Sequence, residues 1–265
     1  MTHTPHPNLK LLFVSTPVGP LGTGLGGGVE LSLYNIAQEM LRRKHTLQIV
    51  APHGSIFDSM PLVQIPGNFQ IIAQSQERSA PITMPGNSVL VNMWDYARQV
   101  QADYDLIVNF AYDWLPFYLT PFFTRPIAHF VSMGSLYEAM DQIIEQVVAQ
   151  FPGTIGFYTP SQATTFAINQ QCPCLSSGID LSLYQFCQVP TPCLAWLGRI
   201  APEKGLEDAV AAVKIAKFLS KLWAKCKIRT TGSRFAKTTR MHLLNTWDFY
   251  QLLNCSKNCA SVGHC

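Results

Sequence analysis

The sequence is poor in charged residues and contains no long apolar run. Only 13% of its 265 residues are charged and 48% are hydrophobic, a composition that favours a globular protein and excludes a disordered chain. No stretch reaches about 18 apolar residues, so no membrane-spanning helix is predicted. The most apolar region, 106–123, is interrupted by Asp113, Pro116 and Pro121. The N-terminus also lacks the basic and apolar segments of a signal peptide, and we therefore expect a cytoplasmic protein.

Acidic residues are almost absent from the end of the sequence. Residues 218–265 hold eight basic residues and a single acid, Asp248, whereas residues 1–217 hold eleven basic and fifteen acidic residues. Four of the eight cysteines also lie in residues 218–265. Two interpretations stay open. Residues 218–265 are either a basic interaction segment, or a sequence that does not belong to the fold of the preceding residues.

The cysteines do not have the spacing of a metal site. Cys255, Cys259, His264 and Cys265 resemble a zinc-binding set, but the adjacent His264 and Cys265 cannot easily both point into one tetrahedral site. A cytoplasmic chain also favours thiols over disulfides. We therefore expect free cysteines and no metal.

Apolar strands alternate with amphipathic helices along most of the chain. This alternation predicts an α/β fold with a doubly wound parallel sheet, in which the ligand site lies at the carboxyl ends of the strands. The predicted strands are 9–16, 45–52, 104–111, 126–133 and 154–161, and the predicted helices are 28–43, 87–100, 135–151 and 162–170.

A Pro-rich segment, 187–193, separates this pattern from a second one. There a strand over 194–200 precedes a helix over 202–218. One strand and one helix bury little apolar surface by themselves, so we expect the residues after about 220 to be poorly ordered. The predicted parts are a Rossmann-like N-terminal domain over 1–188, the start of a second Rossmann-like domain over 189–217, and an aberrant basic tail over 218–265.

Six glycines lie within residues 19–30, directly after the first predicted strand. Gly22, Gly24 and Gly27 fit the dinucleotide-binding pattern G-x-G-x-x-G. A dinucleotide site also needs an acidic residue at the end of the second strand to bind the ribose, and here that strand ends in Ala-Pro-His at 51–53. We therefore interpret the loop as a cradle for another anion, with a plain flexible turn as the alternative.

A second motif, "LGRIAPEKG" at 197–205, contains two basic residues near a predicted helix start. Arg199 lies just beyond a strand and Lys204 at the beginning of the helix, with Gly198 and Gly205 beside them. Such a pair can clamp a pyrophosphate, because arginine binds in a fork and lysine as a point charge. The alternative is that both are solvated loop residues.

The order of these motifs resembles the family 4 glycosyltransferases, which have the GT-B fold. "GGGVE" (26–30) resembles the Gly-Gly-x-Glu loop of that family, and "SSGIDLSLYQF" (176–186) resembles its Asn-Gly-Val-Asp…Phe segment. "GRIAPEKG" (198–205) matches the Gly-Arg-x-x-x-x-Lys-Gly signature most specifically. The resemblance covers residues 9–217. Within the family, the segment "FVSTPVGPLG" (13–22) is also similar in sequence to UDP-glucose:tetrahydrobiopterin glucosyltransferases.

The resemblance implies retaining transfer of a hexosyl unit from a sugar nucleotide to a small-molecule acceptor, without metal, cofactor or nucleic acid. Arg199 and Lys204 would stabilise the charge that grows on the leaving diphosphate. The donor-binding residues implied in this way are Gly26, Gly27, Gly28, Glu30, Gly198, Arg199, Lys204 and Gly205.

The sequence departs from the family at three places, of which the mildest is Ser177 in place of the usual asparagine before Gly178. Many members carry a histidine that faces the sugar; alignment on Pro126 puts Ser132 there and His129 three residues earlier. Both are candidate catalytic residues, although a buried histidine with satisfied hydrogen bonds is the favoured explanation of His129. The family also carries a later Glu-x7-Glu motif that grips the donor, and this chain has no glutamate after Glu207.

The missing glutamates and the change in composition lead to the hypothesis of a frameshift near residues 218–222. We therefore expect a truncated, inactive glycosyltransferase. Two alternatives stay open: a binding module for a sugar nucleotide or acceptor without catalysis, and an NAD-dependent oxidoreductase, which the absent acid at the end of the second strand disfavours.

Overall fold

The computed structural model describes most of the chain, in two compact units. The units are Met1–Tyr184 and Gln185–Cys265, so their division lies close to the predicted boundary at 188 and 189. In the part of the chain that the structure describes, no helix has the length and apolarity needed to span a membrane. The described residues are 8–23, 27–57, 60–168, 172–183, 186, 188–189, 193–199, 204–216 and 219–225.

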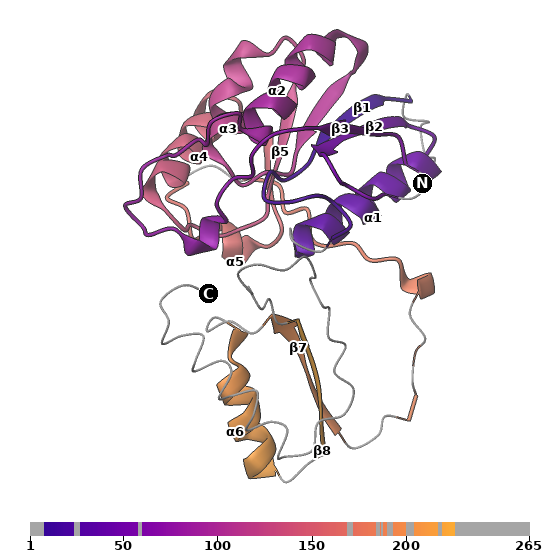
Figure 1. The fold of residues 1–265 in the computed structure, drawn as a ribbon, viewed down its shortest axis with the longest axis vertical. Helices are drawn as coiled ribbons and strands as arrows, with labels where there is room; N and C mark the ends of the chain where they lie inside the picture. Colours follow the sequence, from indigo (N-terminus) through magenta and orange to yellow (C-terminus); the bar gives the residue numbers. More distant parts are fainter. Residues whose placement is uncertain are drawn as a thin grey trace. The chain divides into compact units, whose positions relative to one another are not determined.

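The first unit is a six-stranded parallel sheet with helices on its faces (Figure 1). Its strands are β1 (Lys10–Val14), β2 (Thr46–Pro52), β3 (Leu62–Ile65), β4 (Leu106–Asn109), β5 (Ile127–Val131) and β6 (Ile155–Phe157). Its α-helices are α1 (Gly28–Arg42), α2 (Val89–Val100), α3 (Trp114–Leu119), α4 (Glu138–Gln150) and α5 (Pro160–Ala163). Short 3-10 turns lie at Ala73–Ser75, Gln101–Asp103, Thr120–Phe122 and Leu181–Leu183.

The strand order is β3-β2-β1-β4-β5-β6, and every pair is parallel. The order reverses at β1, which lies between β2 and β4, and the carboxyl ends of β1 and β4 therefore flank the topological switch point where open α/β sheets bind ligands. The predicted doubly wound α/β fold is confirmed. The sequence analysis did not assign β3, a four-residue edge strand with only partial burial.

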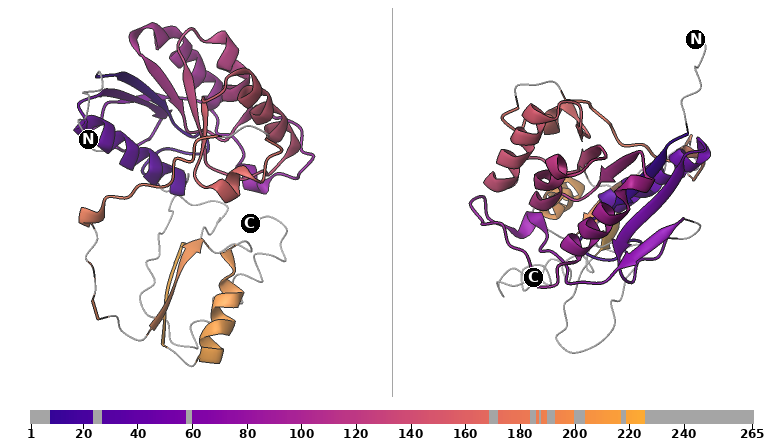
Figure 2. Two further views of the ribbon diagram at one scale, coloured as in Figure 1. Left: turned by 180° about the vertical axis from the view of Figure 1, so that it is seen from behind. Right: turned by 90° about the horizontal axis from the view of Figure 1, so that it is seen from above.

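Alternate residues of β1 build two cores on opposite faces of the sheet. Leu11 and Phe13 pack with residues of α1, whose Val29 and Leu33 recur at helical spacing and are buried. Leu12 and Val14 pack instead against α2. A third cluster joins α4 to β5 and β6. The two views of Figure 2 show the helices on both faces.

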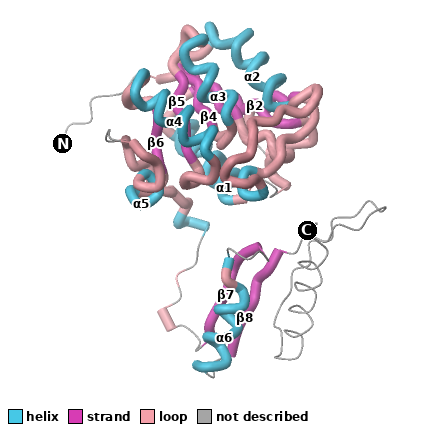
Figure 3. The backbone as a smooth tube through the Cα atoms, turned by 90° about the vertical axis from the view of Figure 1, so that its left-hand side faces the viewer, coloured by secondary structure: helices cyan, strands magenta, loops and turns pink. Residues whose placement is uncertain are grey.

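The second unit contains a parallel β-α-β arrangement (Figure 3). Strand β7 (Cys193–Arg199) pairs with β8 (Leu219–Lys225), and α6 (Leu206–Ala216) connects them. Leu206 and Val210 of α6 are buried. The sequence analysis did not assign β8, which lies within the segment expected to be an aberrant tail. Residues 226–265, the rest of that segment, lie outside the described residues.

Candidate functional site

The glycine-rich loop after β1 is fastened to the turn after β2. Leu21 N donates a hydrogen bond to Ser55 Oγ at 2.8 Å, and Ile56 N donates to Leu21 O at 2.9 Å. Gly22 has φ +80°, and a Cβ atom there would lie 2.1 Å from Ile56 O. Only glycine fits this position, because both the backbone angle and the close approach exclude a side chain.

Glu30 ties the same loop to the first turn of α1. It is only 7% exposed, and its Oε2 accepts a hydrogen bond from Gly22 N at 3.1 Å. The structure therefore gives Glu30 a contact that holds the loop closed. The predicted contact of the Glu30 carboxylate with a sugar-nucleotide donor stays a prediction.

Gly27 and Gly28 form the start of α1 and border open space. Gly27 precedes the helix with φ +67°, and Glu30 N donates to Gly27 O at 3.2 Å. A Cβ atom added at either glycine would meet no atom within 4 Å. No side chain of the described residues caps the helix, so the N–H groups of Gly28 and Val29 and the positive dipole end of this 15-residue helix suit an anion. Gly26, the third predicted glycine, lies outside the described residues.

His129 lies in β5 and is buried, with 1% of its surface exposed. Asn109 Nδ2 lies 3.1 Å from its Nδ1, and Thr120 Oγ1 lies 2.9 Å from its Nε2. Because an amide nitrogen only donates, Nδ1 accepts and Nε2 carries the proton that it donates to Thr120. The ring also stacks on Phe117 at 4.3 Å between centroids.

Burial lowers the pKa of His129 to about 3, so the ring is neutral at physiological pH. Both ring nitrogens are engaged with protein groups, and the ring is closed off from solvent. This geometry fits a buried histidine with satisfied hydrogen bonds, which is one of the two explanations that the sequence allows. It does not fit contact with a substrate.

Ser132, the other candidate at this place, directly follows β5 and is half-buried. The side-chain amide of Gln162 binds the backbone on both sides of Ser132. Its Nε2 donates to Val131 O at 2.7 Å and to Met133 O at 2.8 Å. The hydroxyl of Tyr112 donates to Gly134 O at 3.1 Å. The backbone on both sides of Ser132 is therefore fixed by side chains from other segments. Its catalytic role stays a prediction.

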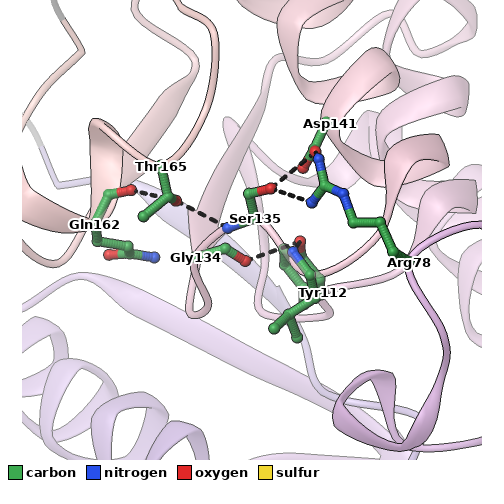
Figure 4. Close-up of polar contacts among 8 residues, drawn as sticks. Arg78, Tyr112, Gly134, Ser135, Asp141, Gln162 and Thr165 are labelled. Carbon is green, nitrogen blue, oxygen red and sulfur yellow. Dashed lines mark hydrogen bonds and ion pairs between the residues drawn. The ribbon is translucent and has the colours of Figure 1, made fainter.

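A second set of contacts holds the end of the same loop (Figure 4). Arg78, in the long segment between β3 and α2, forms an ion pair with Asp141 of α4 at 2.6 Å. The hydroxyl of Ser135 donates to Asp141 Oδ2 at 2.8 Å, and Ser135 N donates to Thr165 Oγ1 at 2.8 Å. The segment after β3 is thus attached to the loop after β5 across the carboxyl-end edge of the sheet.

Asp113 is a residue that the sequence analysis treated only as an interruption of an apolar run. It follows β4 at the switch point, and its Oδ1 accepts a hydrogen bond from Gln70 Nε2 at 3.2 Å. Burial raises the pKa of Asp113 to about 7, while the hydrogen bond from Gln70 opposes this shift. An acidic residue in the short connection between a buried strand and the next helix was the signal that could have identified it.

The second basic motif lies in the second unit. Gly198 and Arg199 end β7, and the side chain of Arg199 lies outside the described part of the chain. Lys204 is exposed, and its carbonyl oxygen accepts a hydrogen bond from Trp196 Nε1 at 3.0 Å. Gly205 has φ +58°, a backbone conformation that favours glycine. Their predicted contacts with a diphosphate stay predictions.

Among the described residues, no cluster of three or more histidine, cysteine, aspartate or glutamate side chains could hold a metal ion. The cysteines and histidine at residues 255–265, whose spacing argues against a zinc site, lie outside those residues.

Solved structures share the fold of this chain. Anabaena Alr3699/HepE in complex with UDP and glucose superposes with a TM-score of 0.57 at 14% identity, over 97% of this chain and 67% of that one. Sucrose-phosphate synthase (tll1590) from Thermosynechococcus elongatus superposes with a TM-score of 0.61 at 13% identity, over 94% of this chain and 68% of that one. Both neighbours are GT-B glycosyltransferases. The chain spans about two thirds of their length.

No protein-family model matches the chain, and a comparison with curated protein sequences finds no match either. At 13–14% identity the structural likeness shows the fold alone.

Proposed function

We propose that the chain has the fold and donor loop of a glycosyltransferase that transfers a hexosyl unit, most simply glucose, from a sugar nucleotide such as UDP-glucose to a small-molecule acceptor. The observation that carries the proposal is the open N-terminus of α1 at Gly27 and Gly28, reached from β1 through a glycine loop that Gly22 and Glu30 fasten. The structural neighbour HepE, which was solved with UDP and glucose, supports it.

The chemistry of the donor explains why such a helix start suits it. A diphosphate carries negative charge, which the exposed N–H groups and the helix dipole stabilise. In the proposed reaction Arg199 and Lys204 of the second unit stabilise the charge that develops on the leaving diphosphate. The proposal needs no metal ion, and it includes retention of configuration at the transferred sugar.

The proposal includes two finer statements that rest on the sequence. One is the acceptor: the resemblance of residues 13–22 to UDP-glucose:tetrahydrobiopterin glucosyltransferases suggests a tetrahydrobiopterin. The other statement is that a frameshift near residues 218–222 replaces the Glu-x7-Glu motif and leaves the chain inactive. The nucleotide sequence around codons 215–225 tests the frameshift. If the reading frames shifted by one or two bases encode no sequence that resembles the family, the frameshift hypothesis is wrong.

Calorimetry with UDP, UDP-glucose and NADH tests the donor class. We expect UDP and UDP-glucose to bind and NADH not to bind. Gly28→Leu places a side chain in the open space at the start of α1, which should abolish UDP binding without unfolding the helix, since leucine favours helices over glycine. Gly86→Leu is the matched control, because a Cβ atom there also meets nothing within 4 Å.

Binding of NADH without UDP would instead support the oxidoreductase alternative. Equal UDP affinity of the Gly28→Leu and wild-type proteins would show that the start of α1 is not the donor site.

A further inference from the structure

Residues 172–175, which follow α5 in the chain, lie along β6 as a short extended stretch. Phe157 N donates a hydrogen bond to Pro173 O at 3.0 Å, and Leu175 N donates to Phe157 O at 2.7 Å. Phe157 and Cys174 thereby form a parallel β-bridge beside the last strand of the sheet. The backbone around Cys174 is therefore fixed by the sheet.

Two cysteines of this stretch line one cavity. A Cβ atom added at Gly156 would lie 2.3 Å from Leu175 Cδ1, so the side chain of Leu175 covers Gly156. Because side chains alternate along an extended chain, Cys174 faces the opposite side. Cys172, two residues earlier, lines the same cavity of about 560 Å³ as Cys174. The walls of the cavity also include Phe157, Thr159, Ala163, Thr164 and Ile168.

The spacing of the two thiols disfavours a disulfide between them. Pro173 has a fixed φ, and it also favours an extended conformation of Cys172, the residue before it. Residues two apart in an extended chain lie about 6.6 Å apart, whereas the Cβ atoms of a disulfide lie about 3.5–4.5 Å apart. A disulfide would therefore strain the backbone that β6 fixes. The wider gap suits a single ion bound between the two sulfur atoms.

The other polar groups of the cavity do not suit a hard cation or an anion. Thr159 Oγ1 accepts a hydrogen bond from Gln162 N at 3.0 Å, and Thr164 Oγ1 donates to Ser161 O at 2.9 Å. None of the described residues that line the cavity is charged. Calcium and magnesium ions need several oxygen ligands, and anions favour arginine or lysine. The two thiols are therefore the groups by which this cavity can recognise an ion.

Both thiols are available to a ligand. They are free cysteines, of which Cys172 is half-buried and Cys174 is exposed. Cys174 Sγ donates to Tyr158 O at 3.2 Å, and Ser176 N donates to the same oxygen at 3.1 Å. The carbonyl group of Tyr158 therefore keeps a hydrogen bond when the thiol of Cys174 turns to a ligand.

The number of thiols selects the kind of metal. Thiolates are soft ligands that bind Cu(I), zinc and iron–sulfur clusters. Structural zinc ions and iron–sulfur clusters take four protein ligands, and the part of the chain that the structure describes holds no group of three or more. Cu(I), in contrast, can be held by two thiolates in line. A soft monovalent ion is therefore the class that fits two cysteines.

We propose that Cys172 and Cys174 bind a soft monovalent metal ion of the Cu(I) class between their thiolates, in the cavity beside β6. Binding forms two metal–sulfur bonds and releases the two thiol protons to water, and no electron is transferred. The complex carries one negative charge, which the exposure of Cys174 keeps in contact with water. The site shares no residue with the loop after β1, so the inference does not rest on the proposed function.

Protection of the thiols from alkylation tests the site in the full chain. Iodoacetamide is added without and with Cu(I), whose free concentration bicinchoninate buffers in the absence of oxygen. Cleavage after Glu145 and Asp180 then releases residues 146–180, which contain Cys172 and Cys174 and no other cysteine. At a free Cu(I) concentration about ten times the dissociation constant, alkylation of both cysteines should slow about 10-fold, because only the unbound site reacts. Zinc ions at the same free concentration should protect much less.

Serine variants test whether the two thiols act together. Cys174 should lose its protection in the Cys172→Ser protein, and Cys172 should lose it in the Cys174→Ser protein. Cys193→Ser is the matched control, because Cys193 lies in β7 of the second unit, and protection should persist there. Urea midpoints equal to that of the wild type show that the variants are folded. The inference is wrong if Cu(I) protects neither cysteine, if zinc protects both equally well, or if either cysteine stays protected when the other is serine.

Discussion

Replacing Gly22 by alanine should destabilise the first unit, although it adds only one methyl group. A Cβ atom at this position would lie 2.1 Å from the carbonyl oxygen of Ile56, far inside van der Waals contact. Neither atom belongs to a flexible side-chain end, so the loop after β1 or the turn after β2 must move. Movement of the loop threatens the hydrogen bonds that Leu21 and Gly22 make to Ile56 and Glu30.

The magnitude follows from two costs. An L-residue held near φ +80° costs about 1–2 kcal/mol relative to glycine. Each of the two hydrogen bonds contributes about 0.5–1.5 kcal/mol when it is lost. We therefore expect the free energy of unfolding to fall by about 2–5 kcal/mol, which lowers the urea midpoint by about 1–2.5 M at an m-value of about 2 kcal/mol/M.

Urea unfolding followed by circular dichroism measures this change, and Gly28→Ala provides a control in the same loop. A Cβ atom at Gly28 meets nothing within 4 Å, and alanine favours helix by up to about 1 kcal/mol over glycine. The Gly28→Ala midpoint should therefore stay unchanged or rise. If Gly22→Ala unfolds at the wild-type urea concentration, the loop does not depend on the close approach to Ile56, and the reasoning is refuted.

Three further outcomes are expected. His129→Leu should lower the free energy of unfolding by about 2–4 kcal/mol in urea titrations, because it removes one buried hydrogen bond from each of Asn109 and Thr120, while the calorimetric affinity for UDP stays unchanged. Since the unfolded chain binds a proton at His129 more readily than the folded one, the contribution of His129 to stability should decrease as the pH drops from about 6.5 towards 3. Asp113, whose pKa is raised, acts in the opposite direction in both proteins, so the stability of wild type relative to His129→Leu should be smaller at pH 4.5 than at pH 7 in urea titrations. A double-mutant cycle with Arg78→Ala and Asp141→Asn should give a coupling of up to about 1 kcal/mol, because the arginine is largely solvent-exposed; a coupling near zero would show that the pair does not hold the loop.

Most elements of the first unit could be predicted because their burial is periodic in the sequence. Helix α1 has buried Val29 and Leu33 four residues apart, and β1 has apolar residues towards both faces. Strand β3 escaped prediction since it is four residues long, lies at the sheet edge and buries little surface. Propensity and pattern alone give no signal for such a strand.

The candidate site could be predicted only in part. The glycine loop and its helix are visible in the sequence, since a run of glycines directly before an amphipathic helix is typical of an anion-binding helix start. The roles within the loop were not visible. The sequence grouped Gly22 with the other glycines of the pattern, whereas the structure shows that its neighbour Ile56, more than thirty residues away, forbids a side chain.

The sequence by itself determined the alternation of strands and helices, the position of the glycine-rich loop between β1 and α1, and the resemblance to glycosyltransferases. These features depend on local spacing and composition. Only the tertiary structure decided which polar groups meet: Asp113 with Gln70, 43 residues apart, and His129 with Asn109 and Thr120 in the core. Such pairings depend on strand order and on desolvation, which raise the pKa of one carboxyl group and bury one histidine among protein partners, and local sequence determines neither.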